Sequence, residues 1–392
     1  MKAPTTLTIG VVAVMSASAC AVDPAAAQDV IKLGLSVPLS GSAANWGKGS
    51  EFMCQKAAEE INQAGGIKAS GKTYNFECIT YDNKYNAAEG TKVAQTLINR
   101  DAVKFIGGAL GTAPTKALQA IAERQDVLLF TVSWGKSLKG PEHPMTFTQQ
   151  NTPYEILPPL IGYVVKQHSQ AKTVAMLNPN DATGQETEPV AKATYEKNGI
   201  KVFASDYYER GTTEFQAIAA RIASFKPEII DVGSTPPADA GAIFKALDLM
   251  GWKGVKVNET GTGADTLKET GGDAAEGVYM GSGVVFDGDT VSAYQRKLND
   301  EARKLLGEDL NTIQIGFYDA VYALKTAMET ANSVEAKKVA ETLPDITFPT
   351  FYGGKVGFFG KETYGNVQQM RLPILVTQVQ KGKLVQVHRI DP

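Results

Sequence analysis

The chain has 392 residues, more than one compact domain usually contains and enough for two. Apolar residues make up 43% and charged residues 21%, the balance of a soluble folded protein and not of a disordered one. The 39 lysines and arginines against 42 aspartates and glutamates leave a net charge of −3, which excludes the dense basic face that nucleic-acid binding requires. The composition therefore predicts a two-domain protein that handles a small molecule and binds no nucleic acid.

The first 27 residues have the pattern of a secretory signal peptide. Lys2 precedes the apolar stretch Thr8–Met15, and small residues follow up to Ala25–Ala27, which form an A-x-A cleavage site. The alternative is a lipobox that would leave Cys20 lipidated, but Ala17 stands where lipoboxes usually carry a larger aliphatic residue. We therefore expect residues 1–27 to be removed and the mature protein to be exported without a lipid.

Short, β-rich apolar runs alternate with longer helical patterns in the first part of the mature chain. The pattern predicts strands over Ile31–Val37, Tyr74–Tyr81, Val103–Gly107 and Val127–Val132, and helices over Gly49–Gln63, Ala87–Arg100 and Pro114–Arg124. This alternation indicates a parallel sheet with helices on both faces, because the crossover between parallel strands needs a connection of helical length.

The same pattern restarts after about 150 residues and gives a second α/β unit of similar size. It predicts helices over Pro153–Gln167, Thr187–Lys197, Thr213–Ser224 and Ala238–Met250, and strands over Thr173–Leu177, Val202–Tyr208, Ile229–Val232 and Val255–Val257. No linker rich in Pro, Gly and Ser separates the units, so we expect several short connections between them.

The last third begins with two periodic helices and ends in extended segments. The helices are predicted over Tyr294–Leu306 and Thr312–Ala331, and the extended segments over Gly354–Phe359, Pro373–Gln380 and Leu384–Val387, with a hairpin turn at Gly382. These pieces are too few for a third domain, so we expect them to complete the first two.

Cys54 and Cys78 are the two cysteines that remain after residue 27. Export to an oxidising compartment permits them to pair, and they fall in a helix and in the strand that follows it, which often touch in an α/β layer. A disulfide across this loop of about 25 residues would stabilise the fold by ~3 kcal/mol. Two buried free thiols are the alternative.

The sequence offers no set of residues that would carry catalysis. It contains no G-x-S-x-G elbow and no glycine-rich phosphate-binding motif, and its three histidines, His143, His168 and His388, are scattered. The paired carboxylates at Glu59–Glu60 and Glu186–Glu188 fall on helix surfaces that we expect to be solvated. We therefore predict a binding protein that is not an enzyme and that needs neither a cofactor nor a metal.

Three loops follow the carboxyl ends of predicted strands, where open α/β sheets bind their ligands. They are Pro38–Gly47, in which Trp46 is the one large ring, Gly107–Pro114, which leads into a helix, and Thr131–Gly135, which carries a hydroxyl and a second indole. Taken singly, each loop has a structural explanation as a surface plug, a tight turn or a helix cap. Together their hydroxyls, free amides and indoles predict one half of a carboxylate-binding cleft.

Several segments, taken together, occur in an order and spacing that is specific to one family of proteins. They are Pro38–Gly47, Ala57–Ile67, Tyr81–Asn83, Ala94–Ile98, Val103–Gly108, Ala275–Val278 and Gly354–Phe358. Together they resemble the leucine/isoleucine/valine-type periplasmic solute-binding proteins over essentially the whole mature chain.

The resemblance implies an α/β fold of two Rossmann-like lobes joined by three hinge crossings. By analogy, the first lobe comprises residues 28–148 and 284–369, and the second comprises residues 149–283 and 370–392. Such receptors close on a small ligand by hinge motion and deliver it to a membrane ABC permease, and we expect this one to act as a monomer.

The resemblance assigns ligand contacts in the first lobe to seven positions. Loops matching Leu110, Gly111 and Thr112, and Ser133, Trp134 and Gly135, would hold the carboxylate of the ligand, and Trp46 would cover the ligand. Tryptophan stands there where the branched-chain amino-acid binders tend to have tyrosine.

In the second lobe the resemblance singles out three positions. Thr183 and Thr235 match aromatic positions of the family, and these smaller side chains predict room for a solute larger than leucine. Glu259 matches the carboxylate that would accept the ammonium of an amino acid, since a desolvated carboxylate needs a partner. A loop glutamate in water is the alternative for Glu259.

We therefore expect an exported receptor for a small organic carboxylate, with an amino acid as the main candidate. An aromatic or other non-amino carboxylic acid is the alternative, and it would leave Glu259 unused. Two rival classes are an exported hydrolase, which would need an activated nucleophile, and a bilobal transcription regulator. The regulator would begin with a DNA-binding helix-turn-helix, where this chain has the pattern of a signal peptide.

Overall fold

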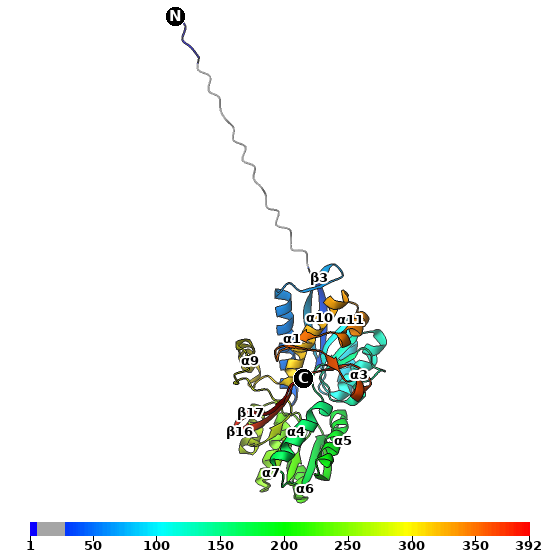
Figure 1. Ribbon diagram of the computed structural model, residues 1–392, viewed down its shortest axis with the longest axis vertical. Helices are drawn as coiled ribbons and strands as arrows, with labels where there is room; N and C mark the ends of the chain where they lie inside the picture. Colours follow the sequence, from blue (N-terminus) through cyan, green and yellow to red (C-terminus); the bar gives the residue numbers. More distant parts are fainter. Residues whose placement is uncertain (6–27) are drawn as a thin grey trace.

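The computed structural model describes residues 1–5 and 28–392 of the chain. The predicted cleavage site at Ala25–Ala27 and the alternative lipid site at Cys20 lie outside the described residues. Two sheet-bearing lobes stack along the long axis of the molecule, and the segments nearest the C-terminus lie between and beside them (Figure 1). No helix in the described ranges is long and apolar enough to cross a lipid bilayer.

The first lobe is built from both ends of the chain. Its strands are β1 (Asp29–Val37), β2 (Ile67–Ala69), β3 (Lys72–Asp82), β4 (Phe105–Ala109), β5 (Leu128–Thr131), β6 (Thr146–Thr148), β14 (Phe358–Phe359) and β15 (Gln369–Met370). Its helices are α1 (Ala44–Gln63), α2 (Ala87–Ala94), α3 (Thr112–Ala122), α9 (Ala293–Leu306), α10 (Thr312–Ala331), α11 (Ala336–Thr342) and α12 (Lys361–Tyr364).

In the described chain the strands of the first lobe form one sheet in the order β14-β15-β6-β5-β4-β1-β3-β2. The strands from β15 to β3 are parallel to their neighbours, and the edge strands β2 and β14 are antiparallel. β4 and β5 are buried along their whole length, as expected for parallel strands that are covered by helices on both faces. A small separate pair, β12 (Phe348–Pro349) and β13 (Lys355–Val356), follows α11.

The second lobe repeats the same plan and also ends with a C-terminal segment. Its strands are β7 (Thr173–Pro179), β8 (Lys201–Tyr208), β9 (Ile229–Asp231), β10 (Val255–Asn258), β11 (Tyr279–Met280), β16 (Ile374–Gln380) and β17 (Lys383–Ile390). Its helices are α4 (Pro153–Gln167), α5 (Ala182–Lys197), α6 (Gln216–Ser224), α7 (Pro237–Leu249) and α8 (Ala264–Gly271). Within residues 28–392 the sheet order is β17-β16-β11-β10-β9-β7-β8, and the strands from β11 to β8 are parallel.

Within residues 28–392 the chain passes from one sheet to the other three times: from β6 to β7, from β11 to β14 and from β15 to β16. The first and third passes are tied together, because the side-chain amide of Asn151 donates to the carbonyls of Leu372 and Pro373 at 3.1 and 2.9 Å. The buried ammonium of Lys139 spans the same two passes, donating to Gln369 at 2.6 Å and to Thr152 at 3.3 Å.

Cys54 and Cys78 form a disulfide in the structure. Cys54 lies in α1 and Cys78 in β3, so the bond joins a helix to the sheet beneath it. Of the two alternatives that the sequence leaves open, the bridge is therefore the one found.

The first helix begins earlier than the sequence predicts. α1 starts at Ala44 instead of Gly49, so Trp46 lies in its first turn and not in a loop. Gly47 within this turn serves close packing, since a Cβ atom there would come within 1.8 Å of the Pro38 carbonyl oxygen. The sequence also gave no sign of the short strands β2, β6 and β11, or of helices α8 and α11.

Glu60 is not a solvated surface carboxylate, contrary to the prediction. It accepts hydrogen bonds from the hydroxyl groups of Tyr294, Tyr318 and Tyr322, with the Tyr318 bond at 2.7 Å. These tyrosines come from α9 and α10, so Glu60 holds three helices of the first lobe together.

Candidate functional site

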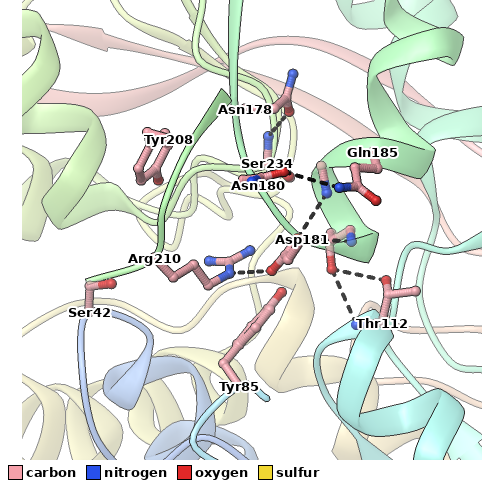
Figure 2. Close-up of polar contacts among 12 residues, drawn as sticks. Ser42, Tyr85, Thr112, Asn178, Asn180, Asp181, Gln185, Tyr208, Arg210 and Ser234 are labelled. Carbon is pink, nitrogen blue, oxygen red and sulfur yellow. Dashed lines mark hydrogen bonds and ion pairs between the residues drawn. The ribbon is translucent and has the colours of Figure 1, made fainter. Parts of the chain in front are cut away.

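Residues at the carboxyl ends of the two sheets meet across the gap between the lobes. Such an arrangement brings loop side chains from both lobes to one place, as expected at the ligand-binding edge of parallel sheets. The contacts that join the lobes involve Thr112 with Thr183, Trp46 with Thr262, and Ser42 with Asp239. We define this region as the interlobe site (Figure 2).

Thr112 and Thr183 form one contact between the lobes at the interlobe site. The backbone amide of Thr112, at the start of α3, donates to the Thr183 hydroxyl at 3.2 Å, and that hydroxyl donates to the Thr112 hydroxyl at 3.0 Å. Gly135 lies beside this pair, where a Cβ atom would come within 2.4 Å of the Thr112 methyl group. Three predicted site residues, Thr112, Thr183 and Gly135, therefore come together where the lobes meet.

Glu186 on α5 makes a second junction between the lobes. Its carboxylate accepts hydrogen bonds from the Ser137 amide at 3.0 Å, the Ser137 hydroxyl at 2.6 Å and the Lys116 ammonium at 3.0 Å, all of them in the first lobe. Burial alone would raise the pKa of Glu186, but the bonds from Ser137 and Lys116 outweigh it and lower the pKa. The expectation that Glu186 lies on a solvated face is therefore wrong.

Trp46 reaches across to the second lobe. Its indole N–H donates to the Thr262 hydroxyl at 3.3 Å, and the residue is 3% exposed. The ring lies among the buried apolar side chains of the first lobe, close to Ala43 at the start of α1. Trp46 is therefore at the interlobe site, as a contact that joins the lobes.

Three of the predicted first-lobe residues are engaged inside the fold. The Leu110 amide donates to the Ser36 carbonyl at 3.0 Å, and the Ser133 hydroxyl bonds the Thr115 hydroxyl at 2.8 Å. Trp134 belongs to the buried apolar cluster that contains residues of α4. Gly111 has a φ of +93° immediately before α3, a left-handed conformation that favours glycine.

Arg210 is a charged residue of the interlobe site that the sequence analysis did not single out. It follows β8, and its Nε atom donates to a carboxylate oxygen of Asp181. The aromatic ring of Tyr85, which follows β3 in the first lobe, lies under the guanidinium with its centroid 3.9 Å from Cζ. Figure 2 shows the guanidinium between Asp181 and Tyr85, with Ser42 and Tyr208 to one side.

Tyr208 and Asp239 complete the second-lobe side of the interlobe site. The Tyr208 hydroxyl donates to Asp239 at 3.2 Å, and the Ser42 hydroxyl of the first lobe donates to the same oxygen at 3.4 Å. Burial raises the pKa of Asp239, against the opposing effects of Tyr208 and Arg210. Thr235, a predicted site residue, is fully buried next to Tyr208.

Glu259 is fully buried, so the alternative of a loop glutamate in water is excluded. Its carboxyl group lies near Asp231, which is occupied by hydrogen bonds from the Tyr195 hydroxyl and the Gly233 amide at 2.8 Å each. Apart from a proton shared with Asp231, no donor of the described residues reaches either oxygen of Glu259. Burial and the charge of Asp231 hold the pKa of Glu259 well above its usual range, so Glu259 is the protonated member of the pair.

The residues that the sequence analysis missed share one signal. Tyr85 follows β3, and Tyr208 and Arg210 lie at or just after the end of β8, so they occupy the same strand-end positions that pointed to the first-lobe loops. Applying that rule to the ends of β3 and β8 would have found them.

A family model described as periplasmic binding protein matches residues 30–383. The chain belongs to this family. The two stacked lobes and the contacts between the carboxyl ends of their sheets are thus those of a periplasmic binding protein.

This periplasmic binding protein is similar to a curated relative from Pseudomonas aeruginosa, named "Leucine-, isoleucine-, valine-, threonine-, and alanine-binding protein". The two are 26% identical over 337 residues, which cover 85% of this chain and 86% of the relative.

Two solved structures have the same fold. One is the branched-chain amino acid transporter substrate-binding protein of Streptococcus pneumoniae in complex with isoleucine, with a TM-score of 0.75, 22% identity, and coverage of 93% of this chain and 100% of that one. The other is a solute-binding protein of an ABC transporter from Rhodopseudomonas palustris in complex with 3,4-dihydroxybenzoic acid, with a TM-score of 0.76, 20% identity, and coverage of 93% and 98%.

Proposed function

We propose that the protein is an exported receptor that captures a small carboxylate-bearing solute between its lobes and delivers it to a membrane ABC permease. In this proposal residues 1–27 are a signal peptide, the mature protein works as a monomer in the periplasm, and it catalyses no reaction. The lobes are residues 28–148 with 284–369, and residues 149–283 with 370–392.

The observation that supports this proposal most is the meeting of polar strand-end residues from both lobes at the interlobe site. A solute held there would touch both lobes, so its binding would favour the closed arrangement over an open one. The relatives named above are described as binding amino acids or an aromatic acid, which is the chemistry that the strand-end donors suit.

An amino acid is the main candidate because of Glu259. Apart from the proton shared with Asp231, no donor of the described residues reaches the Glu259 oxygens, and an ammonium beside them would supply one. An aromatic or other non-amino acid is the second candidate, and the rings of Trp46, Tyr85 and Tyr208 at the interlobe site favour it.

Titration calorimetry with amino acids and with amine-free aromatic acids tests the proposal and separates the two candidates. If Glu259 pairs with an ammonium, it must ionise on binding and release a proton. Because its pKa is raised in the structure, amino-acid affinity should then increase as the pH rises through the range in which Glu259 loses its proton. The number of protons released is measured by repeating the titration in buffers of different ionisation enthalpy.

Glu259→Gln is the matched variant for this test. It should weaken amino-acid binding by about tenfold or more and remove the pH dependence, while leaving amine-free acids unaffected. An equal loss for both kinds of acid would contradict the role of Glu259, and an absence of binding by every acid would contradict the proposed function itself.

A further inference from the structure

The guanidinium of Arg210 has a terminal nitrogen, Nη2, that is buried and has no hydrogen-bond partner. Arginine cannot lose its proton in a protein, so this nitrogen remains a donor at every accessible pH. An unpaired buried donor on a charged group is more costly than one on a neutral group. The position therefore calls for an acceptor that the described residues do not supply.

Asp181 cannot supply that acceptor, because one of its oxygens caps α5 and the other accepts the Nε hydrogen bond of Arg210. Asp181 is the N-cap of α5, and its Oδ1 atom accepts from the amides of Thr183 and Gly184 at 2.9 and 3.1 Å. Only Oδ2 is left for Arg210, and it takes the Nε donor. A side-by-side pair of two parallel hydrogen bonds, which arginine and carboxylate usually form, is thereby prevented.

Asp181 is the carboxylate that pairs with Arg210. That single carboxylate is shared between the guanidinium and the positive end of the α5 dipole. Asp239 is a second acid near Arg210, and burial raises its pKa against the opposing effects of Tyr208 and Arg210. Tyr85 covers one face of the guanidinium without neutralising it.

Two of the first-lobe donors that were expected to hold the carboxylate are used within the protein. The Thr112 amide donates to Thr183, and the Leu110 amide donates within the sheet. Arg210 has an unpaired donor, Nη2, at the interlobe site, and its side chain as a whole is 18% exposed.

We propose that Arg210 holds the carboxylate of the solute, so that the anion is bound mainly from the second lobe. This inference rests on the proposed function, because it names the residue that binds the carboxylate in the interlobe site. Arg210 would then determine the preference for an acid over its amide, because a hydrogen bond from Nη2 to a charged carboxylate oxygen is stronger than a bond to a neutral amide oxygen.

The test compares acids with their amides by titration calorimetry on the purified protein: L-leucine with L-leucinamide, and benzoate with benzamide. In the wild-type protein at least one acid should bind, and more tightly than its amide. Arg210→Gln should weaken that acid by about tenfold to a hundredfold and bring acid and amide to similar affinity. The control is Lys116→Gln, which removes a cation from another contact between the lobes and should leave the acid-to-amide ratio unchanged.

Asp181→Asn provides a second variant with the opposite expected sign. Asparagine caps a helix as well as aspartate does, so α5 should keep its start while Arg210 loses its competing carboxylate. The acid should then bind severalfold more tightly than to the wild-type protein, and the amide should not.

An unchanged acid-to-amide ratio in Arg210→Gln, or no gain in acid binding in Asp181→Asn, would overturn the assignment of Arg210 while leaving the receptor function intact. If neither acid binds the wild-type protein, the proposed function fails and the assignment fails with it.

Discussion

Asp319 is a buried acid that is only partly hydrogen-bonded, and this affects how it titrates. It lies within α10, where its Oδ1 atom accepts from the Phe351 amide at 2.7 Å and its Oδ2 atom has no partner. Burial raises the pKa of Asp319 to about 8, against the opposing effect of the Phe351 amide. The residue is therefore largely protonated in the fold at neutral pH and ionised in the unfolded chain.

This difference predicts a pH-dependent stability. Because the pKa in the fold is raised, the contribution of Asp319 is fully present below its unfolded value of 3.8 and is lost as pH rises through about 8. Asp319→Asn keeps an oxygen for the Phe351 amide but does not titrate. Thermal unfolding between about pH 5 and pH 9 should show the variant gaining stability over the wild type as pH rises, and parallel curves would contradict the prediction.

At the scale of elements, the disulfide between α1 and β3 restrains the part of the first lobe that carries Trp46. The bond closes a loop with a sequence separation of 24. The chain-entropy model gives ~3 kcal/mol for a loop of this size. The start of α1, and with it the Trp46 contact to the second lobe, is therefore held against the sheet by a covalent link.

Replacing both cysteines by serine should lower the unfolding midpoint by several degrees, since ~3 kcal/mol is a large share of the stability of a domain. Thermal unfolding with and without a reducing agent measures the effect. The double variant serves as its own control because a reducing agent should not change its midpoint. A wild-type midpoint that is insensitive to reduction would show that the bond contributes little.

The sequence predicted most elements of the fold because their signals are local. Strands such as β1 and helices such as α4 and α10 follow from apolar periodicity, and α4 and α10 have the predicted bounds. The start of α1 could not be predicted, because its glycines are explained only by contacts with Pro38 and Gln314. The two-residue strands β11 and β15 likewise take their identity from sheet neighbours and not from their own pattern.

The site was predicted less completely than the fold. Strand-end position pointed correctly to Thr112 and Gly135 at the junction of the lobes, but no sequence rule shows which donors a neighbour has already taken. The same limit applies to Glu259, whose surroundings depend on Asp231 and Tyr195 from other elements. The unpaired donor of Arg210 becomes apparent only in the structure, where Asp181 both caps α5 and bonds Arg210.

At the scale of the whole molecule, part of the free energy that closes the proposed receptor around its solute would come from contacts that the lobes make with each other. The Glu186 contacts with Ser137 and Lys116, and the pair Thr112 and Thr183, do not depend on the chemistry of the solute. They should therefore strengthen the binding of every solute to a similar degree.

Glu186→Gln tests this expectation. The loss of charge weakens the bonds from Lys116 and Ser137, so affinity should fall about threefold to tenfold for every solute that binds, with the order of preference unchanged. Calorimetry on two or more solutes measures it. Glu196→Gln, an exposed position on the same helix, makes the same charge change and should have no effect. A loss confined to one solute would mean that Glu186 contacts that solute.

Both sheets need strands from the C-terminal end of the chain to be complete. β15 completes the first sheet beside β6, and β16 completes the second beside β11, although more than 90 residues separate each strand from its neighbour. During synthesis from the amino end, both half-built sheets would present unpaired strand edges until the last segments emerge, and such edges promote aggregation. Loss of the chain beyond about residue 360 would thus leave both sheets without a strand, so neither lobe can be completed before the C-terminal segment is in place.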